Sequence, residues 1–193
     1  MTDSPLSLAP STLLLWAPPL PKVRYTRVGR AGPFELPKQV LEERSSEPRL
    51  EGDRALIRRW TFDVTAAERL TEDALIAYTA EGLLDIGTFG DDGELSAWDP
   101  PQLVMPAAPA AGASWAADHT RGEATTSRKG EVIGCPEHPD CLVAISESRR
   151  PDGILVLRRH FFKGQGYRGY EALVRMPGQP DMHIWTEDFA VLG

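Results

Sequence analysis

Glycine and proline punctuate this chain from end to end, and their distribution constrains the fold more than any single motif does. The 193 residues include 17 Pro and 17 Gly, spread along the sequence and not gathered in one tract. Proline breaks helices and glycine favours turns, so the pattern predicts many short elements and excludes long helices. The length fits one domain that can bury a core without staples.

The segments between these turns carry the residue types that strands prefer. Arg54 to Val64 and Ile154 to Phe162 are rich in β-branched and aromatic side chains. A helix is expected only at Thr65 to Asp73, because Thr65 can cap it and Glu68 completes a capping box. The prediction is a mostly β chain with one short helix, folded as an antiparallel sandwich or a partly closed barrel.

Two passages of the chain resemble each other. Gly52 to Phe62 (GDRALIRRWTF) and Gly153 to Phe162 (GILVLRRHFF) each combine a turn glycine, an apolar run, paired arginines and aromatics. The match needs a one-residue gap, so a true duplication and a chance likeness both stay open. On this basis one compact domain is divided into an extended Pro-rich arm (1–21), a first β-meander half (22–98), a Pro-rich crossover (99–112) and a second, similar half (113–193).

Charge and hydrophobicity exclude several classes of partner. The net charge of −7 argues against non-specific binding to nucleic acid and against docking on anionic lipid. No apolar run reaches membrane-spanning length. The run Leu13 to Trp16 is short and no basic residue precedes it, unlike a secretory signal. A cytoplasmic location is therefore expected, with a periplasmic one as the alternative if a precursor has been trimmed.

The arm contains four consecutive large apolar residues, Leu13, Leu14, Leu15 and Trp16. In an extended segment they could add to the sheet edge of another protein or fill a groove on it. The alternative is that they fold back onto their own domain.

A compact Cys and His cluster is the most distinctive local motif. Cys135, His138 and Cys141 have the spacing C-x2-H-x2-C and could offer three ligands to zinc, although zinc sites usually pair two such ligand doublets. The other readings are a plain loop with reduced thiols and a local disulfide. A cytoplasmic location favours free thiols. No cofactor is expected unless this cluster holds zinc.

The paired arginines form a second candidate site. Arg58-Arg59 and Arg158-Arg159 could bind an anion if both pairs converge, or one arginine of each pair could face solvent and meet an acid on the neighbouring strand. Elsewhere the histidines and glycines match no catalytic or phosphate-binding signature, so no catalytic residue is assigned and the sequence leans away from an enzyme.

The stretch WDPPQLVMPAAPAAGASW, from Trp98 to Trp115, resembles a recurring feature of uncharacterised bacterial β-domain proteins described as TapB-like or lipoprotein-like. The residues that carry the resemblance are Pro100, Pro101, Leu103, Pro106, Gly112 and Trp115. The resemblance implies a β fold and brings no known activity. The chain lacks a lipobox, which puts the envelope location of such proteins in doubt.

Three hypotheses about function follow from these observations. The first is a non-catalytic accessory protein that binds another protein. The second is a β-barrel that binds a small apolar ligand in an internal cavity. The third is a metal or redox role centred on Cys135, His138 and Cys141.

Overall fold

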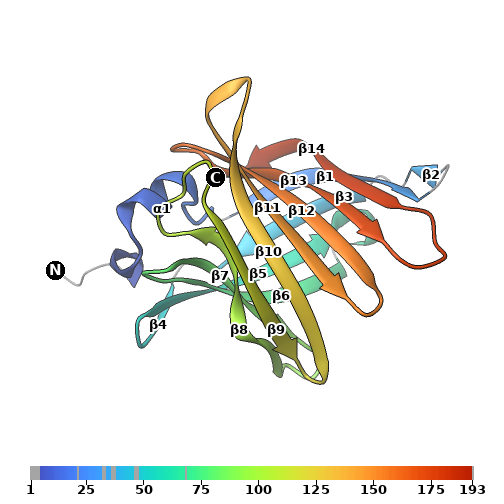
Figure 1. Ribbon diagram of the computed structural model, residues 1–193, viewed down its shortest axis with the longest axis horizontal. Coiled ribbons are helices and arrows are strands. Elements are labelled where there is room, and N and C mark those ends of the chain that lie inside the picture. The colour runs from blue at the N-terminus through green and yellow to red at the C-terminus, as the bar shows by residue number, and fades with distance from the viewer. Residues whose placement is uncertain are drawn as a thin grey trace.

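A closed β-barrel forms the body of the protein (Figure 1). The computed structural model describes residues 5–20, 22–31, 34–35, 38–45, 48–67 and 69–192. Within these residues twelve antiparallel strands form one continuous wall, and the last strand pairs with the first. In order around the barrel they are β1 (Lys22–Ala31), β3 (Lys38–Arg44), β5 (Arg54–Asp63), β6 (Arg69–Tyr78), β7 (Gly82–Phe89), β8 (Leu95–Pro106), β9 (Ser114–Arg121), β10 (Ala124–Cys135), β11 (His138–Arg150), β12 (Gly153–Phe162), β13 (Gly166–Arg175) and β14 (Met182–Val191).

Two short strands lie beside this wall. β2 (Phe34–Glu35) pairs with β1, and β4 (Arg49–Glu51) pairs with β5. The mostly β prediction and its barrel alternative are confirmed. The barrel closes fully because β14 pairs with β1 from Val23 to Ala31, which removes the exposed sheet edges that an open sandwich would keep.

Side chains alternate between the interior and the outer surface of the wall. On β10, Thr126, Arg128, Gly130 and Val132 are buried while the residues between them are exposed. This period of two is the pattern that the strand segments predict. The buried set here includes a charged residue, so the barrel interior is not uniformly apolar.

The helix expected at Thr65 to Asp73 is wrong. The chain makes one 3-10 turn at Val64–Ala66, where the Asp63 carboxylate accepts the Thr65 N–H at 3.1 Å. β6 then begins at Arg69 and pairs along its length with β5. Glu68, the other half of the expected capping box, lies outside the described residues. Pairing with β5 outweighs the weak helix propensity of this short segment.

The N-terminal arm is helical and not extended as expected. Residues Pro5–Leu8 form a 3-10 helix and Ser11–Trp16 form the α-helix α1. α1 lies across one end of the barrel (Figure 1), where Leu13 is fully buried in the main core cluster. The Tyr78 hydroxyl donates to the Ala17 carbonyl oxygen at 2.9 Å, which fixes the chain as it leaves α1. Among the described residues no helix is long and apolar enough to span a membrane.

The division into two similar halves does not match the barrel. The expected crossover, 99–112, is largely strand, because β8 continues to Pro106 through a cis peptide bond at Asp99–Pro100. The resembling segments fall on β5 and β12, which are separated by seven antiparallel steps and therefore run in opposite directions. A rotation that reverses strand direction also reverses strand order around a barrel. The two segments are therefore not equivalent positions of a repeated unit.

Candidate functional site

Two partly open pockets in the barrel share a set of charged and aromatic lining residues, and together they form the cavity. A small part of about 80 Å³ lies beneath α1, next to Ala17 and Pro18. A larger part of about 320 Å³ extends toward the opposite end of the barrel, past Leu155 near the start of β12 and Ile184 near the start of β14. Glu42, Arg59, Asp85, Arg159 and Tyr167 line both parts.

Strand alternation separates the two arginines of each pair. Arg59 and Arg159 line the cavity. Arg58 lies on the outside of the wall and makes a two-pronged ion pair with Asp73 on β6, at 2.8 and 2.6 Å. Arg158 lies outside as well, 3.8 Å from Glu171 on β13. Arg58 and Arg158 thus face outward and meet acids on neighbouring strands, while Arg59 and Arg159 line one cavity. Binding of an anion there stays a prediction.

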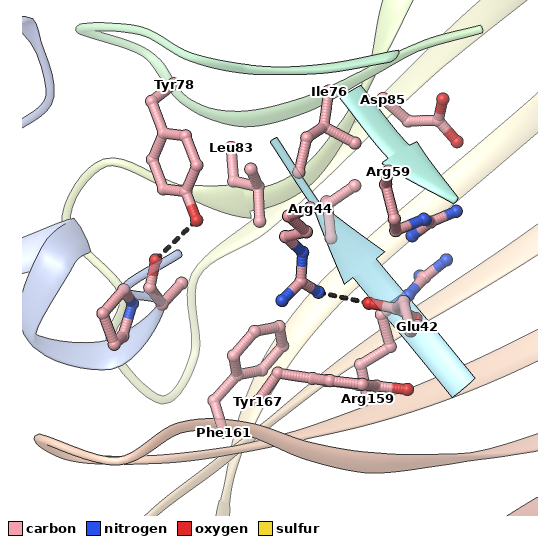
Figure 2. Close-up of a pocket in the computed structure, with 13 residues that line it drawn as sticks. Glu42, Arg44, Arg59, Ile76, Tyr78, Leu83, Asp85, Arg159, Phe161 and Tyr167 are labelled. Atoms are coloured by element: carbon pink, nitrogen blue, oxygen red, sulfur yellow. Dashed lines mark hydrogen bonds and ion pairs between the residues drawn. The ribbon is translucent and has the colours of Figure 1, made fainter. Parts of the chain in front are cut away.

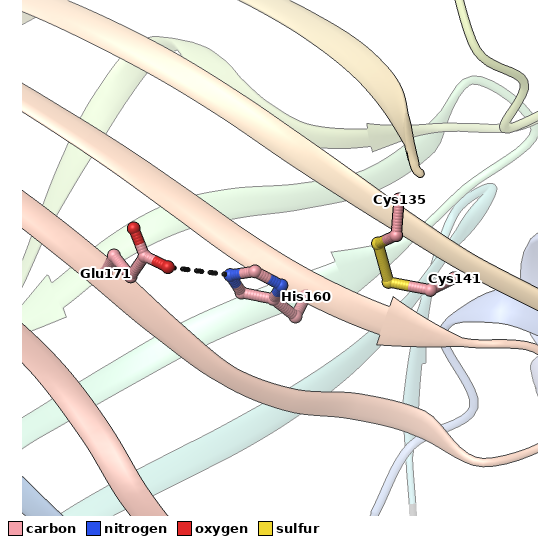
Figure 3. The surroundings of a disulfide bond; sticks show 4 residues. All are labelled: Cys135, Cys141, His160 and Glu171. Carbon is pink, nitrogen blue, oxygen red and sulfur yellow. Dashed lines mark ion pairs between the residues drawn. A yellow bond between two sulfur atoms is a disulfide. The ribbon is translucent and has the colours of Figure 1, made fainter. Parts of the chain in front are cut away.

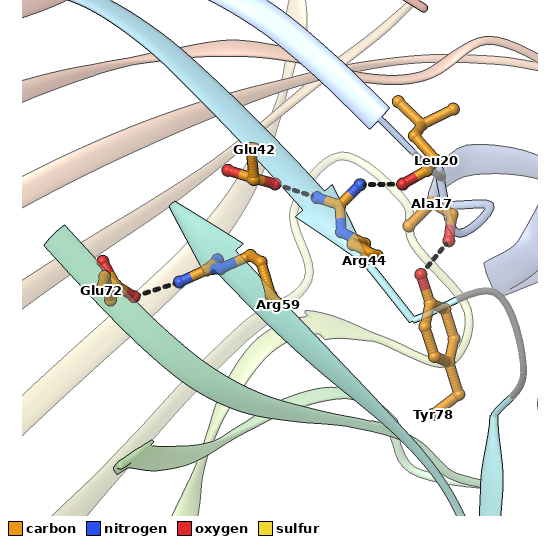
Figure 4. A network of polar contacts seen from close by, with 7 residues as sticks. All are labelled: Ala17, Leu20, Glu42, Arg44, Arg59, Glu72 and Tyr78. Carbon is orange, nitrogen blue, oxygen red and sulfur yellow. Dashed lines mark hydrogen bonds and ion pairs between the residues drawn. The ribbon is translucent and has the colours of Figure 1, made fainter. Parts of the chain in front are cut away.

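Two of the inner cations are neutralised by acids (Figure 4). Arg44 pairs with Glu42, and its other terminal nitrogen donates to the Leu20 carbonyl oxygen at 2.7 Å. Arg59 pairs with Glu72 on β6. The Arg44 contact joins β3 to the chain that follows α1, and the Arg59 pair joins β5 to β6. They also account for two of the three acids on the cavity wall.

The remaining charges are not balanced. No hydrogen bond or ion pair joins Arg159 to another described residue, although the charges of Asp85 and Glu72 favour its ionised form. Oδ1 of Asp85 is buried without a hydrogen-bond partner among the described residues. Arg128 is buried on β10 and donates to Gln102, but its Nε and Nη2 have no acceptor in the described part of the chain. Figure 2 shows Arg159, Arg59, Asp85 and Glu42 directed into the same space.

Burial shifts the ionisation of these groups toward their neutral forms. It lowers the pKa of Arg128 to about 10, and the nearby charge of Arg159 lowers it further in the same direction. Burial also lowers the pKa of Arg159. It raises the pKa of the Asp85 carboxyl, against the opposing effect of the neighbouring arginines. In each case burial is the largest cause and favours the neutral form of the group.

Tyrosines supply neutral donors beside the arginines. Burial raises the pKa of the Tyr25 and Tyr167 phenols well above their ordinary value, so both stay protonated at neutral pH. The rings of Tyr25 and Tyr170 meet edge to face with centroids 6.3 Å apart. All three tyrosines line the larger part of the cavity.

Apolar walls lie on both sides of the charged residues. Near α1 the wall is formed by Ile76, Leu83, Val104 and Phe161. In the larger part it is formed by Leu155, Leu157, Ala172, Val174 and Ile184. The cavity can therefore hold an apolar body against either wall while a polar group of the same molecule reaches the arginines.

The predicted arm residues divide between core and surface. Leu13 is buried, Leu14 and Trp16 pack partly against the core, and Leu15 is 42% exposed. The Leu15 carbonyl oxygen accepts the Gly164 N–H at 2.7 Å, which joins α1 to the β12–β13 turn. The arm thus folds back onto its own domain, and its binding to another protein stays a prediction.

The two cysteines form a disulfide across the β10–β11 hairpin, with Cα atoms 5.4 Å apart. This is one of the three readings of the motif. His138 lies against Phe162, with ring centroids 5.9 Å apart. His160 on β12 is the histidine grouped with the two sulfurs, within 4.8 Å. Sequence spacing missed His160 because it comes to the hairpin through the pairing of β11 with β12.

Comparison with known proteins adds no assignment: no family model, no curated protein and no solved structure matches the chain. The resemblance to TapB-like and lipoprotein-like domains therefore stays a prediction.

Proposed function

We propose that the protein binds a small amphipathic anion, such as a molecule with a carboxylate and an apolar body, inside its barrel. This modifies the small apolar ligand predicted from the sequence, because the cavity is charged at its middle. A ligand anion would lie against Arg159, with the tyrosine phenols as further donors, and its body against the apolar wall.

The single observation that carries this proposal is that Arg159 lines the cavity without a hydrogen bond or ion pair to another described residue. An inward-facing arginine without an acid partner costs folding free energy, since its hydration is only partly replaced. Arg27 is a further cation on the cavity wall, and Arg128 is buried close by. Asp85 opposes the charges of Arg128 and Arg159, and Glu72 also opposes that of Arg159. An anion in the cavity would restore the balance, as acids already do for Arg44 and Arg59.

The size and lining of the cavity support a small molecule and not a polymer. A volume of about 320 Å³ in the larger part is at the low end of the range for ligand pockets. One ion pair with Arg159 and one apolar wall suit a ligand with a single charged end. Holding a ligand in this way requires no chemical reaction, and we therefore propose a binding protein.

The test measures binding of three compounds that share an apolar chain and differ only in the end group: octanoate, octanol and octylammonium. An anionic naphthalene sulfonate dye serves as the displaced probe. Octanoate should displace the dye best, because only its end group pairs with Arg159. Equal displacement by octanol would contradict an anion site, and stronger displacement by octylammonium would indicate a cation site instead.

Arg159→Gln and Arg158→Gln form a matched pair of variants, one inside and one outside the barrel. A hydrogen bond to a charged group contributes on the order of 1.5–3 kcal/mol, so Arg159→Gln should weaken octanoate binding at least about tenfold. Arg158→Gln should bind as the unchanged protein does. Equal loss in both variants would count against a site inside the barrel.

The cellular location of the protein and any protein partner are also proposals. A disulfide is more common in oxidising compartments, which favours the periplasmic alternative over the cytoplasmic one. Fractionation of the native host, with detection of the protein in each compartment, tests this. Recovery with the cytoplasmic fraction alone would contradict it.

A further inference from the structure

A second constellation lies on the outer face of the barrel, away from the cavity. Cys135 and Cys141 join the β10–β11 hairpin, and His160 projects from β12 beside them (Figure 3). The ligand atoms of these three residues all lie within 4.8 Å of one another. Cys141 is 2% exposed, while Cys135 and His160 are partly exposed, so the group is half-buried but reachable from solvent.

The orientation of His160 is set by an acid on the next strand. Glu171 on β13 lies 3.5 Å from Nε2 of His160. This leaves Nδ1 as the ring nitrogen on the side of the two sulfurs (Figure 3). A carboxylate behind a histidine is a common arrangement at metal sites, because it fixes the ring and raises the basicity of the ligating nitrogen.

We propose that reduction of the disulfide creates a zinc-class metal site formed by Cys135, Cys141 and His160, with Glu171 as a positioning residue. Two thiolates and an imidazole are the ligands that zinc prefers, and three protein ligands leave a fourth position for water or another small ligand. The site is independent of the barrel cavity. Whether or not metal binds at this site therefore has no bearing on whether an anion binds in the cavity.

The chemistry of the conversion is balanced with an external dithiol reductant. The reductant supplies two electrons and two protons, which turn the disulfide into two thiols, while the reductant itself becomes a disulfide. Metal binding then releases the two thiol protons, because thiolates are the ligands. The metal keeps its oxidation state throughout.

The backbone geometry permits both states. Tetrahedral zinc with bonds of about 2.3 Å to sulfur requires the two sulfurs to lie about 3.8 Å apart. The Cα atoms of Cys135 and Cys141 are 5.4 Å apart, so rotation of the two side chains can open this separation. His160 lies on β12, outside the β10–β11 hairpin, so it does not need to move with the two cysteines.

The experiment titrates the full-length, reduced protein with Co²⁺ under anaerobic conditions, followed by Zn²⁺. Thiolate-to-cobalt charge transfer and the intense visible bands of tetrahedral cobalt report the ligand set directly. One equivalent of Co²⁺ should give both signals, and one equivalent of Zn²⁺ should abolish them. The oxidised protein should give neither, since its sulfurs are bonded to each other.

Three histidine variants decide which imidazole binds. His160→Gln should weaken Co²⁺ binding by more than about 100-fold, because it removes a ligand and not only a supporting group. His138→Gln and His183→Gln are matched controls and should bind as the unchanged protein does. If His138→Gln loses binding and His160→Gln does not, the proposed ligand set is wrong.

Glu171→Gln tests the positioning role. It should weaken Co²⁺ binding by about 10–100-fold while the charge-transfer band at saturation is retained, because the ligands stay the same. Cys135→Ser/Cys141→Ser should lose the band altogether. Circular dichroism checks that each variant is folded. If the serine double variant does not fold, the His160→Gln variant and the oxidised protein decide the outcome. A reduced protein without thiolate-to-cobalt charge transfer would overturn the proposal.

Discussion

Arg158 and Arg159 are adjacent in the chain and lie on opposite sides of the barrel wall. Arg158 is outside, 3.8 Å from the carboxylate of Glu171. Arg159 is inside, at the junction of the two parts of the cavity, and has no acid partner among the described residues. This contrast offers a control for each experiment on the cavity, because the same substitution can be made one residue away.

Replacing Arg159 by methionine should stabilise the protein when no ligand is present. The substitution keeps most of the side-chain volume and removes a poorly compensated ion, so the free energy of unfolding should rise by about 1–3 kcal/mol. Arg158→Met should change it by less than about 0.5 kcal/mol. Urea unfolding measures both. A destabilised Arg159→Met would show that the cavity compensates this charge already.

Replacing Asp85 by asparagine should strengthen anion binding. The variant removes the acid on the cavity wall that makes no ion pair with a described residue, and loss of a like charge several ångströms from the ligand is worth about tenfold in affinity. Displacement of the sulfonate dye measures this. Unchanged affinity would place the ligand anion away from Asp85.

Asp85 should also make anion binding depend on pH. Burial raises its pKa, so the carboxyl takes up a proton as the pH falls through that raised value. The protonated group no longer repels an anion, and affinity for the sulfonate, which stays ionised, should rise as the pH falls. Asp85→Asn should flatten this profile. A profile that is the same in the variant would assign the pH dependence to another group.

Replacing Gly130 by alanine should destabilise the barrel. The ring of Trp115 occupies the place where a Cβ of residue 130 would lie, so alanine forces the indole or the strand to shift. Overpacking of this kind costs about 1–3 kcal/mol. Gly134→Ala on the same strand is the control, since nothing lies within 4 Å of its Cβ position. Urea unfolding followed by tryptophan fluorescence compares them, and equal stability would contradict the packing.

Tyr78 should make the protein sensitive to alkali. Burial raises the pKa of its phenol to about 12, whereas an unfolded tyrosine ionises near 10. The neutral phenol is favoured by the folded state, so this stabilisation is complete below about pH 10 and is lost as the pH rises toward about 12. Tyr78→Phe should lose less stability over that range in urea unfolding. An equal fall of the free energy of unfolding with pH in the variant and in the unchanged protein would contradict this.

The same variant should loosen α1 at neutral pH. Phenylalanine cannot donate to the Ala17 carbonyl oxygen, and the lost hydrogen bond should lower the free energy of unfolding by about 0.5–1.5 kcal/mol. Amide exchange of Leu14 and Ala17, whose N–H groups donate within this segment, should become faster. Unchanged exchange would mean that core packing of Leu13 alone holds the helix.

Local pattern was enough to predict the mostly β class and the places of two long strands. The two segments rich in β-branched and aromatic residues, Arg54 to Val64 and Ile154 to Phe162, fall on β5 and β12 within one residue at each end. It failed at Thr65 to Asp73, where pairing with β5 outweighs a local capping pattern. It also failed at the arm, because burial of Leu13 against distant strands makes a short helix favourable that the sequence alone would not hold.

The sequence by itself determined the mostly β class and strands such as β5 and β12, because steric preferences act within a few residues. Only the tertiary structure decided that β14 meets β1, which turns one face of every strand into a common interior. That closure brings Arg59 and Arg159 to one cavity, and the pairing of β11 with β12 brings His160 to Cys135 and Cys141. Contacts between residues far apart in the chain depend on strand order and register around the whole barrel, which no local pattern encodes.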